Sequence, residues 1–149
     1  MKNRERRFRI FPRLILDFNY GYLFLMIRYE LAEDIGAEIE DILHKLDMSH
    51  VDGSRVVCVR SEGSKSKRVI ARCHGLSRIM QLALGEKPRY VIEVVSERFD
   101  RLNKEEQTKV LIHELMHIPY SFGGGFRAHK PHVTRKKVER MYKKLVNAR

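Results

Sequence analysis

The segment His113–His117, which reads HELMH, constrains this chain more than any other feature of the sequence. Its two histidines stand on one face only if the backbone between them is an α-helix, because four residues advance about 400° around the helix axis. The flanking residues favour such a helix. Asn103 and Glu106 form a capping-box pattern at its start, and Pro119 disfavours helical geometry just past its end. We therefore predict a helix over residues 103–117.

Periodicity predicts further helices and strands before and after this helix. Apolar residues recur every three or four positions, as in amphipathic helices, over residues 35–46, 77–84 and 134–146. Strand-favouring residues cluster over residues 55–60, 68–73 and 90–96. The polar stretch 61–66 between the first two strands predicts a hairpin. The strand 90–96 is apolar almost throughout, which leaves open whether it lies at an edge or at the centre of the sheet.

Together these elements predict an α+β fold. We expect an antiparallel or mixed sheet of three to four strands, packed on the helix that carries HELMH and flanked by other helices. A length of 149 residues fits one domain with a hydrophobic core. The first 28 residues are basic, then aromatic and apolar, without a clear period. We therefore divide the chain into an N-terminal extension, residues 1–28, and a single domain, residues 29–149.

The two histidines of the motif predict a metal site. On a helix, His113 and His117 can both reach one ion, and two neutral imidazoles suit Zn²⁺ in a tetrahedral site. Glu114 lies about 100° further around the helix, so that it is poorly placed as a ligand. It is well placed to act as a general base toward water whose pKa the metal has lowered. The pattern therefore predicts a catalytic zinc site with Glu114 as the base.

A catalytic zinc needs a third protein ligand and one open coordination position. His129, His132 and Glu139 follow the motif and are the candidates. The glycines 123–125 give the chain freedom to turn back after Pro119 and bring His129 or His132 to the metal. Glu139 falls in a separate predicted helix among cations, where an exposed ion pair is the simpler explanation. We favour His129, with His132 as the alternative and Glu139 third.

Other polar residues near the motif have weaker claims. Tyr120 and Arg127 flank the glycines and could polarise a carbonyl or stabilise an oxyanion. Ordinary loop packing of the tyrosine and a solvated arginine are the simpler explanations. We expect His74 to be a strand-end histidine rather than a ligand, and His44 and His50 to lie at the surface.

The net charge of +11 is concentrated at the two ends of the chain, in residues 1–13 and 127–149. Basic ends attract polyanions without sequence preference, so contact with nucleic acid is one interpretation, and solvated surface residues are the other. No run reaches the roughly 18 apolar residues of a membrane helix. Asp17 and Asn19 interrupt the one stretch that could belong to a signal peptide. We expect a cytoplasmic protein without a membrane span.

Three stretches carry a family resemblance: YVIEVVSERF at residues 90–99, LIHELMHIP at 111–119 and GGGFRAHK at 123–130. They resemble a small zincin-like family of metallopeptidases from archaea and phages, akin to the SprT-like and WLM-type proteases. The resemblance covers about residues 30–145. It implies a zincin-like fold, a polypeptide substrate and a third zinc ligand at His129, the histidine before lysine. In zincins a peptide usually pairs with an edge strand beside the active helix, which by order makes 90–96 the candidate strand.

Two classes of function compete. In the first, the chain is a zinc-dependent peptidase with ligands His113, His117 and His129 and the base Glu114. In the second, it is a nucleic-acid-associated protein with a structural zinc, whose fourth ligand would be His132. The two merge in a DNA-associated, SprT-like protease. An open fourth coordination position would favour catalysis, and a filled one would favour a structural role.

Overall fold

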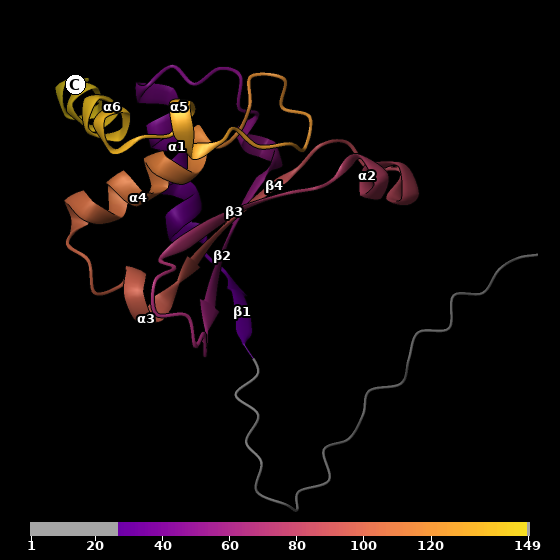
Figure 1. The fold of residues 1–149 in the computed structure, drawn as a ribbon, viewed down its shortest axis with the longest axis horizontal. Coiled ribbons are helices and arrows are strands. Elements are labelled where there is room, and N and C mark those ends of the chain that lie inside the picture. Colours follow the sequence, from indigo (N-terminus) through magenta and orange to yellow (C-terminus); the bar gives the residue numbers. More distant parts are fainter. Residues whose placement is uncertain (1–26, 149) are drawn as a thin grey trace, which may run out of the picture.

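A computed structural model describes residues 27–148 of the chain, and Figure 1 shows how its elements are arranged. In chain order these are β1 (Arg28–Leu31), α1 (Glu33–Lys45), the 3-10 turn η1 (Gly53–Arg55), β2 (Val56–Glu62), β3 (Ala71–Gly75), α2 (Arg78–Leu84), β4 (Tyr90–Val95), α3 (Ser96–Phe99), α4 (Lys104–Met116), α5 (His129–His132) and α6 (Arg135–Asn147). The predicted N-terminal extension, residues 1–28, lies outside the described residues except for its last two, and its boundary stays a prediction.

The elements form an α+β fold around a four-stranded mixed sheet, which confirms the predicted fold class. The four predicted helices correspond to α1, α2, α4 and α6, and the three predicted strands to β2, β3 and β4. The sequence did not predict β1, α3 or α5. Each of these has only four residues, too few to show a period.

The predicted hairpin between residues 55–60 and 68–73 is wrong. The strand order is β1-β2-β4-β3, so that β4 lies between the two strands of the expected hairpin. β4 runs parallel to β2 and antiparallel to β3. The physical reason is the apolar character of Tyr90–Val95, which is buried on both faces and is therefore most stable at the centre of the sheet.

β3, and not β4, is therefore the edge strand next to α4. Within the described residues β3 has a strand neighbour on one side only. The backbone groups of Ile70 and Leu76, which flank β3, form hydrogen bonds on the side of β3 that faces β4, with N···O distances of 2.9 Å. Because backbone groups alternate in direction along a strand, those of Ala71 and Cys73 point to the free edge.

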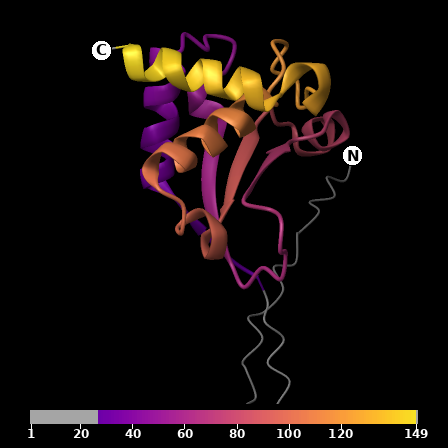
Figure 2. The ribbon, with the colours of Figure 1, turned by 60° about the vertical axis from the view of Figure 1, so that its left-hand side comes forward.

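Three helices build the core and the wall of the site. α1 packs on β2, α4 packs on β3, and α6 packs on the outer side of α4 (Figure 2). The side chains with no exposed surface at the centre of this packing are Tyr90, Ile92, Phe99, Leu111, Ile112, Leu115 and Ile118. Among the described residues no helix has both the length and the apolar character needed to cross a membrane. The cytoplasmic location stays a prediction.

A buried carboxylate ties β3 to β4 on the face of the sheet opposite Ile92. Glu93 is only 2% exposed, and it accepts a hydrogen bond from Arg72 at 3.2 Å and bonds to the His74 Nε2 at 2.7 Å. Burial raises the pKa of Glu93, but hydrogen bonds and the Arg72 charge outweigh burial and hold that pKa below its ordinary value. His74 is thus a strand histidine with a carboxylate partner.

The start of α4 gives a first prediction. The Asn103 side chain accepts a hydrogen bond from the Glu106 N–H at 2.9 Å. We expect Asn103→Ala to lower the free energy of unfolding by about 1 kcal/mol, because that N–H loses its partner. Urea denaturation measures the change. Asn147→Ala, at the exposed end of α6, is the control and should change the free energy by less than about 0.5 kcal/mol. A loss no larger than the control's would contradict the cap.

Candidate active site

The C-terminal half of α4 presents apolar side chains to the core and polar ones to a cavity. Leu111 and Leu115 are fully buried. His113 and His117 are partly exposed and stand one turn apart on the same face, as the spacing predicts. α4 ends at Met116, and His117 forms its C-cap. Both motif histidines therefore lie at the end of the helix, where the chain turns away.

Two hydrogen bonds between His117 and Arg127 hold the returning chain at the end of α4. The Arg127 N–H donates to the His117 carbonyl at 2.8 Å. The His117 Nδ1 lies 2.7 Å from the Arg127 carbonyl oxygen. A carbonyl only accepts, so Nδ1 carries the hydrogen of the neutral ring and Nε2 keeps its lone pair. This pairing also places His129, two residues further on, beside the ring of His117.

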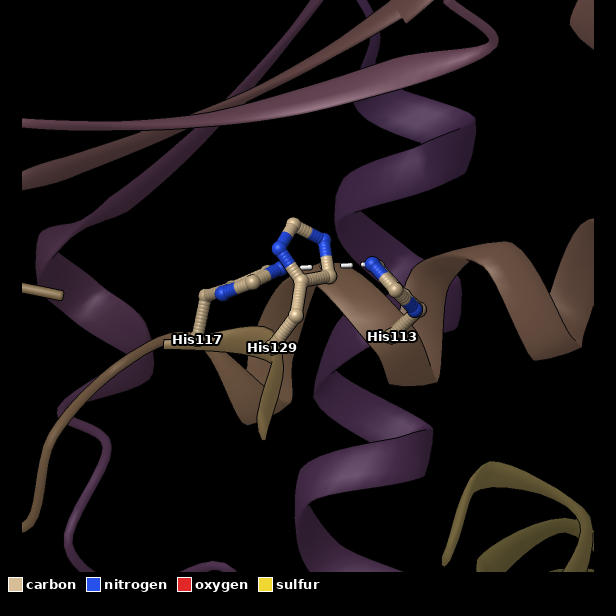
Figure 3. Close-up of side chains that lie close together, drawn as sticks. All are labelled: His113, His117 and His129. Carbon is tan, nitrogen blue, oxygen red and sulfur yellow. Dashed lines mark hydrogen bonds between the residues drawn. The ribbon is translucent and has the colours of Figure 1, made fainter. Parts of the chain in front are cut away.

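The structure brings three histidines together: His113, His117 and His129. Their rings converge from α4 and from the start of α5 (Figure 3). One ligand nitrogen from each lies within 4.8 Å of the others, and the Nε2 atoms of His113 and His117 are 3.2 Å apart. Two nitrogens bound to one tetrahedral zinc lie about 3.3–3.4 Å apart, given bonds of about 2.0–2.1 Å. The spacing of His113 and His117 therefore fits two ligands of one tetrahedral ion, and with His129 they form a group that could hold a metal.

Burial keeps His113 in the state that a metal requires. Burial, and to a smaller extent the positive charges that His117 and His129 can carry, together lower the pKa of His113 to about 4. The imidazole is therefore neutral at physiological pH and has a lone pair to offer. The neutral state of His113 thus follows from its burial and from the two histidine rings beside it.

Glu114 lies on the inner side of the cavity, against β3. Its side chain is 8% exposed. Burial raises the pKa of Glu114 to about 7, and a hydrogen bond from the Cys73 backbone N–H opposes that rise. A carboxyl group whose pKa is near neutrality can both take up and release a proton under physiological conditions.

A cavity of about 540 Å³ joins the histidines, Glu114 and the edge of the sheet. The segment Arg68–Ala71 forms one wall, and residues of α4 and α6 form the other. Val110 and Val138 contribute apolar surface to the second wall. Lys109, in the same wall, is bonded to Glu105 at 2.6 Å and Glu139 at 3.0 Å. Size and lining suit a peptide-sized ligand with access to the three histidines.

The other predicted site residues lie apart from this group. His132 is exposed and does not belong to the cluster of three. Glu139 lines the cavity but is paired with Lys109. Tyr120 and Arg127 do not line the cavity. The Arg127 guanidinium lies over the Tyr120 ring at 4.9 Å from its centroid. Their role in contacting substrate stays a prediction, and loop packing accounts for their present positions.

Two features of the site were not predicted. His50 is half-buried rather than at the surface, and its ring packs against that of Tyr120, tilted by 48° and with 4.5 Å between centroids. The Cys73 backbone N–H, beside Glu114, is a contact that no pattern of side chains can indicate, because every residue except proline has the same N–H group. Only the placement of β3 at the edge of the sheet reveals it.

Comparison with protein-family models gives a match over most of the chain. The family described as "Putative phage metallopeptidase" matches residues 27–147, from the start of β1 to the end of α6. Searches of curated proteins and of solved structures found no match. The matched range includes all three histidines of the cluster and Glu114.

Removal of single histidines tests the ligand set. Loss of a residue that only supports a ligand typically weakens metal binding by roughly 10–100-fold. We expect His129→Ala to weaken zinc binding by more than this, because it removes a ligand. His132→Ala should change the affinity by less than a factor of about three, because His132 lies outside the cluster. Competition with a chromophoric chelator measures both. If His132→Ala weakened zinc binding more than His129→Ala did, the third ligand would be His132.

The raised pKa of Glu114 predicts a pH-dependent cost in the metal-free protein. Its folded-state pKa of about 7 exceeds the ordinary 4.5, so the folded state binds more protons between these pH values, and stability falls as pH rises. With a chelator present, we expect Glu114→Gln to raise the free energy of unfolding at pH 8 by about 2–3 kcal/mol. The difference should vanish below pH 4.5.

Denaturant titrations of both proteins across this pH range provide the measurement. Glu40→Gln, on the exposed face of α1, is the matched control and should shift the free energy by less than about 0.5 kcal/mol at every pH. A gain from Glu114→Gln that is the same at pH 4.5 and pH 8 would show that the charge of the buried carboxylate is not its cause.

Proposed function

The chain belongs to the family of putative phage metallopeptidases, and we propose that it is a zinc-dependent peptidase with Glu114 as general base. Membership in the family implies a metal-dependent peptidase that acts on polypeptides. The convergence of His113, His117 and His129 within 4.8 Å of one another is the observation that carries the finer proposal. It supplies three imidazole nitrogen donors next to a buried carboxylate.

Zinc is the metal that this donor set favours. Three imidazole nitrogens with one position left open are the ligand set of many catalytic zinc sites. When bound, zinc supplies Lewis-acid chemistry: it lowers the pKa of water toward neutrality and polarises a carbonyl oxygen. The protein's part is to hold the three rings in place. His117 does so through its bond to the Arg127 carbonyl, which fixes the orientation of the ring.

Glu114 would take the proton from the attacking water and then deliver it to the leaving amine. Its position supports both steps, because it lines the cavity between the histidines and β3. Its raised pKa brings proton uptake close to physiological pH, where a general base works best. The Cys73 N–H orients the carboxylate from the side of the sheet.

The free edge of β3 would hold the substrate. An extended peptide can add to a sheet by pairing its backbone with an exposed edge. The Cys73 N–H is engaged by Glu114, so the outward backbone groups of Ala71 and the outward carbonyl of Cys73 offer that pairing. The wall Arg68–Ala71 lies across the cavity from the histidines. The substrate strand is therefore β3 rather than the strand 90–96 that order alone suggested, since β4 is paired on both sides.

A structural zinc site with nucleic-acid binding is the alternative. It would need a fourth protein ligand, and within the described residues the cluster holds three. That favours catalysis. Contact with nucleic acid through the basic ends stays a prediction, for which the exposed Lys136, Arg140 and Lys143 of α6 are candidates. A DNA-associated peptidase would combine both properties.

An assay on an unfolded, labelled protein tests the peptidase. The zinc-loaded protein should cleave it, and Glu114→Gln should lower the rate by about 10²–10⁴-fold while zinc content stays the same, because the base is lost and the ligands remain. Cleavage is followed by gel electrophoresis and zinc by atomic absorption. Equal cleavage by both proteins would exclude Glu114 as the base.

Two controls complete this assay. Glu40→Gln removes an exposed carboxylate far from the cavity and should cleave like the wild type. A parallel reaction with double-stranded DNA tests the alternative: DNA that raises the rate of the wild type in a salt-sensitive way would support a DNA-associated peptidase. A protein that binds zinc, never cleaves and binds DNA would instead support the structural site.

A further inference from the structure

The buried hydroxyl of Tyr90 holds the glycine segment that leads from α4 to His129. Tyr90, the first residue of β4, has no exposed surface. Its hydroxyl accepts a hydrogen bond from the Gly124 N–H at 2.9 Å and donates one to the Gly125 carbonyl at 2.8 Å. One side chain of the inner strand β4 thus binds two consecutive residues of the loop.

The loop is docked closely around these two bonds. Gly124 has a φ of +95°, and a Cβ there would come within 2.1 Å of the Leu76 carbonyl oxygen. The Gln81 side-chain amide donates to the Gly123 carbonyl at 3.0 Å and so fixes the neighbouring residue. A segment with this little room can adopt few positions as long as its polar groups remain bonded.

The same loop sets where the third histidine lies. From Gly125 the chain runs only two residues to Arg127, which bonds to His117, and four to His129. A shift of the glycines would therefore move both the carbonyl that orients His117 and the ring of His129. Given the zinc site of the proposed function, on which this step rests, we propose that the Tyr90 hydroxyl is a positioning group for the metal ligands, and for His129 above all.

Tyr90 has no direct part in the chemistry. It does not line the cavity that contains the histidines. Burial raises the pKa of Tyr90, with the Gly124 N–H opposing, so its hydroxyl stays protonated and available as a donor. Its ring packs at 5.0 Å from Phe122 and 6.2 Å from Phe126, between centroids. These ring contacts remain when the hydroxyl alone is removed.

Tyr90→Phe therefore isolates the two hydrogen bonds. We expect it to weaken zinc binding by about 10–100-fold, as loss of a ligand's supporting group usually does. We also expect faster hydrogen exchange of the Gly124 amide in the metal-free protein, and weaker visible absorption of the Co²⁺-loaded protein, because its tetrahedral site is distorted. Ile42→Val, in the core of α1, is the control for general destabilisation and should change none of the three.

Combination with His129→Ala shows whether Tyr90 acts through that ligand. In a His129→Ala background, Tyr90→Phe should weaken zinc binding by less than about threefold, since the ligand it chiefly positions is gone. Full wild-type affinity in Tyr90→Phe, or the same fold-loss with and without His129, would overturn the role of Tyr90 and leave the peptidase intact. A wild-type protein that does not bind zinc would overturn both.

Discussion

The pair of hydrogen bonds between His117 and Arg127 is the constraint on which the site depends. His117 ends α4, and through its carbonyl and its ring it also receives the returning chain. This contact fixes the orientation of the His117 ring and brings the returning chain, with His129 two residues further on, to the end of α4. Because Nδ1 is engaged by a carbonyl, Nε2 is the atom left to face His113. The end of α4 and the candidate metal site thus share the groups of His117.

Desolvation acts on this site in two opposite ways, and both suit the proposed chemistry. It lowers the pKa of His113 to about 4 and raises that of Glu114 to about 7, because burial always disfavours the charged form. The histidine is then a neutral donor, and the carboxyl group can exchange a proton near neutrality. The source of the burial is the packing of α4 between the sheet and α6. The packing that positions His113 and Glu114 therefore also shifts their pKa values.

Local sequence patterns predicted most of the helices and strands, but they predicted the pairing of the strands wrongly. The helix over 103–117 was predicted because its cap, its periodicity and its proline are all within one short segment. The hairpin was wrong because a polar turn between two strands is a local sign, whereas the partner of a strand is decided by the whole sheet. β4, at residues 90–95, is apolar enough to take the central position, and this moves β3 to the edge beside Glu114.

The amino-acid sequence alone predicted the groups available for chemistry: two histidines one helical turn apart, a glutamate beside them and a glycine segment that lets the chain turn back. It left the third ligand open between His129 and His132, because a flexible return can end at either. The tertiary structure places His129 in the cluster of three and His132 outside it, and for this reason we propose His129 as the third ligand. It also decided which strand lies free at the cavity and which hydroxyl holds the loop. These depend on contacts between residues far apart in the chain, and no local pattern records such contacts.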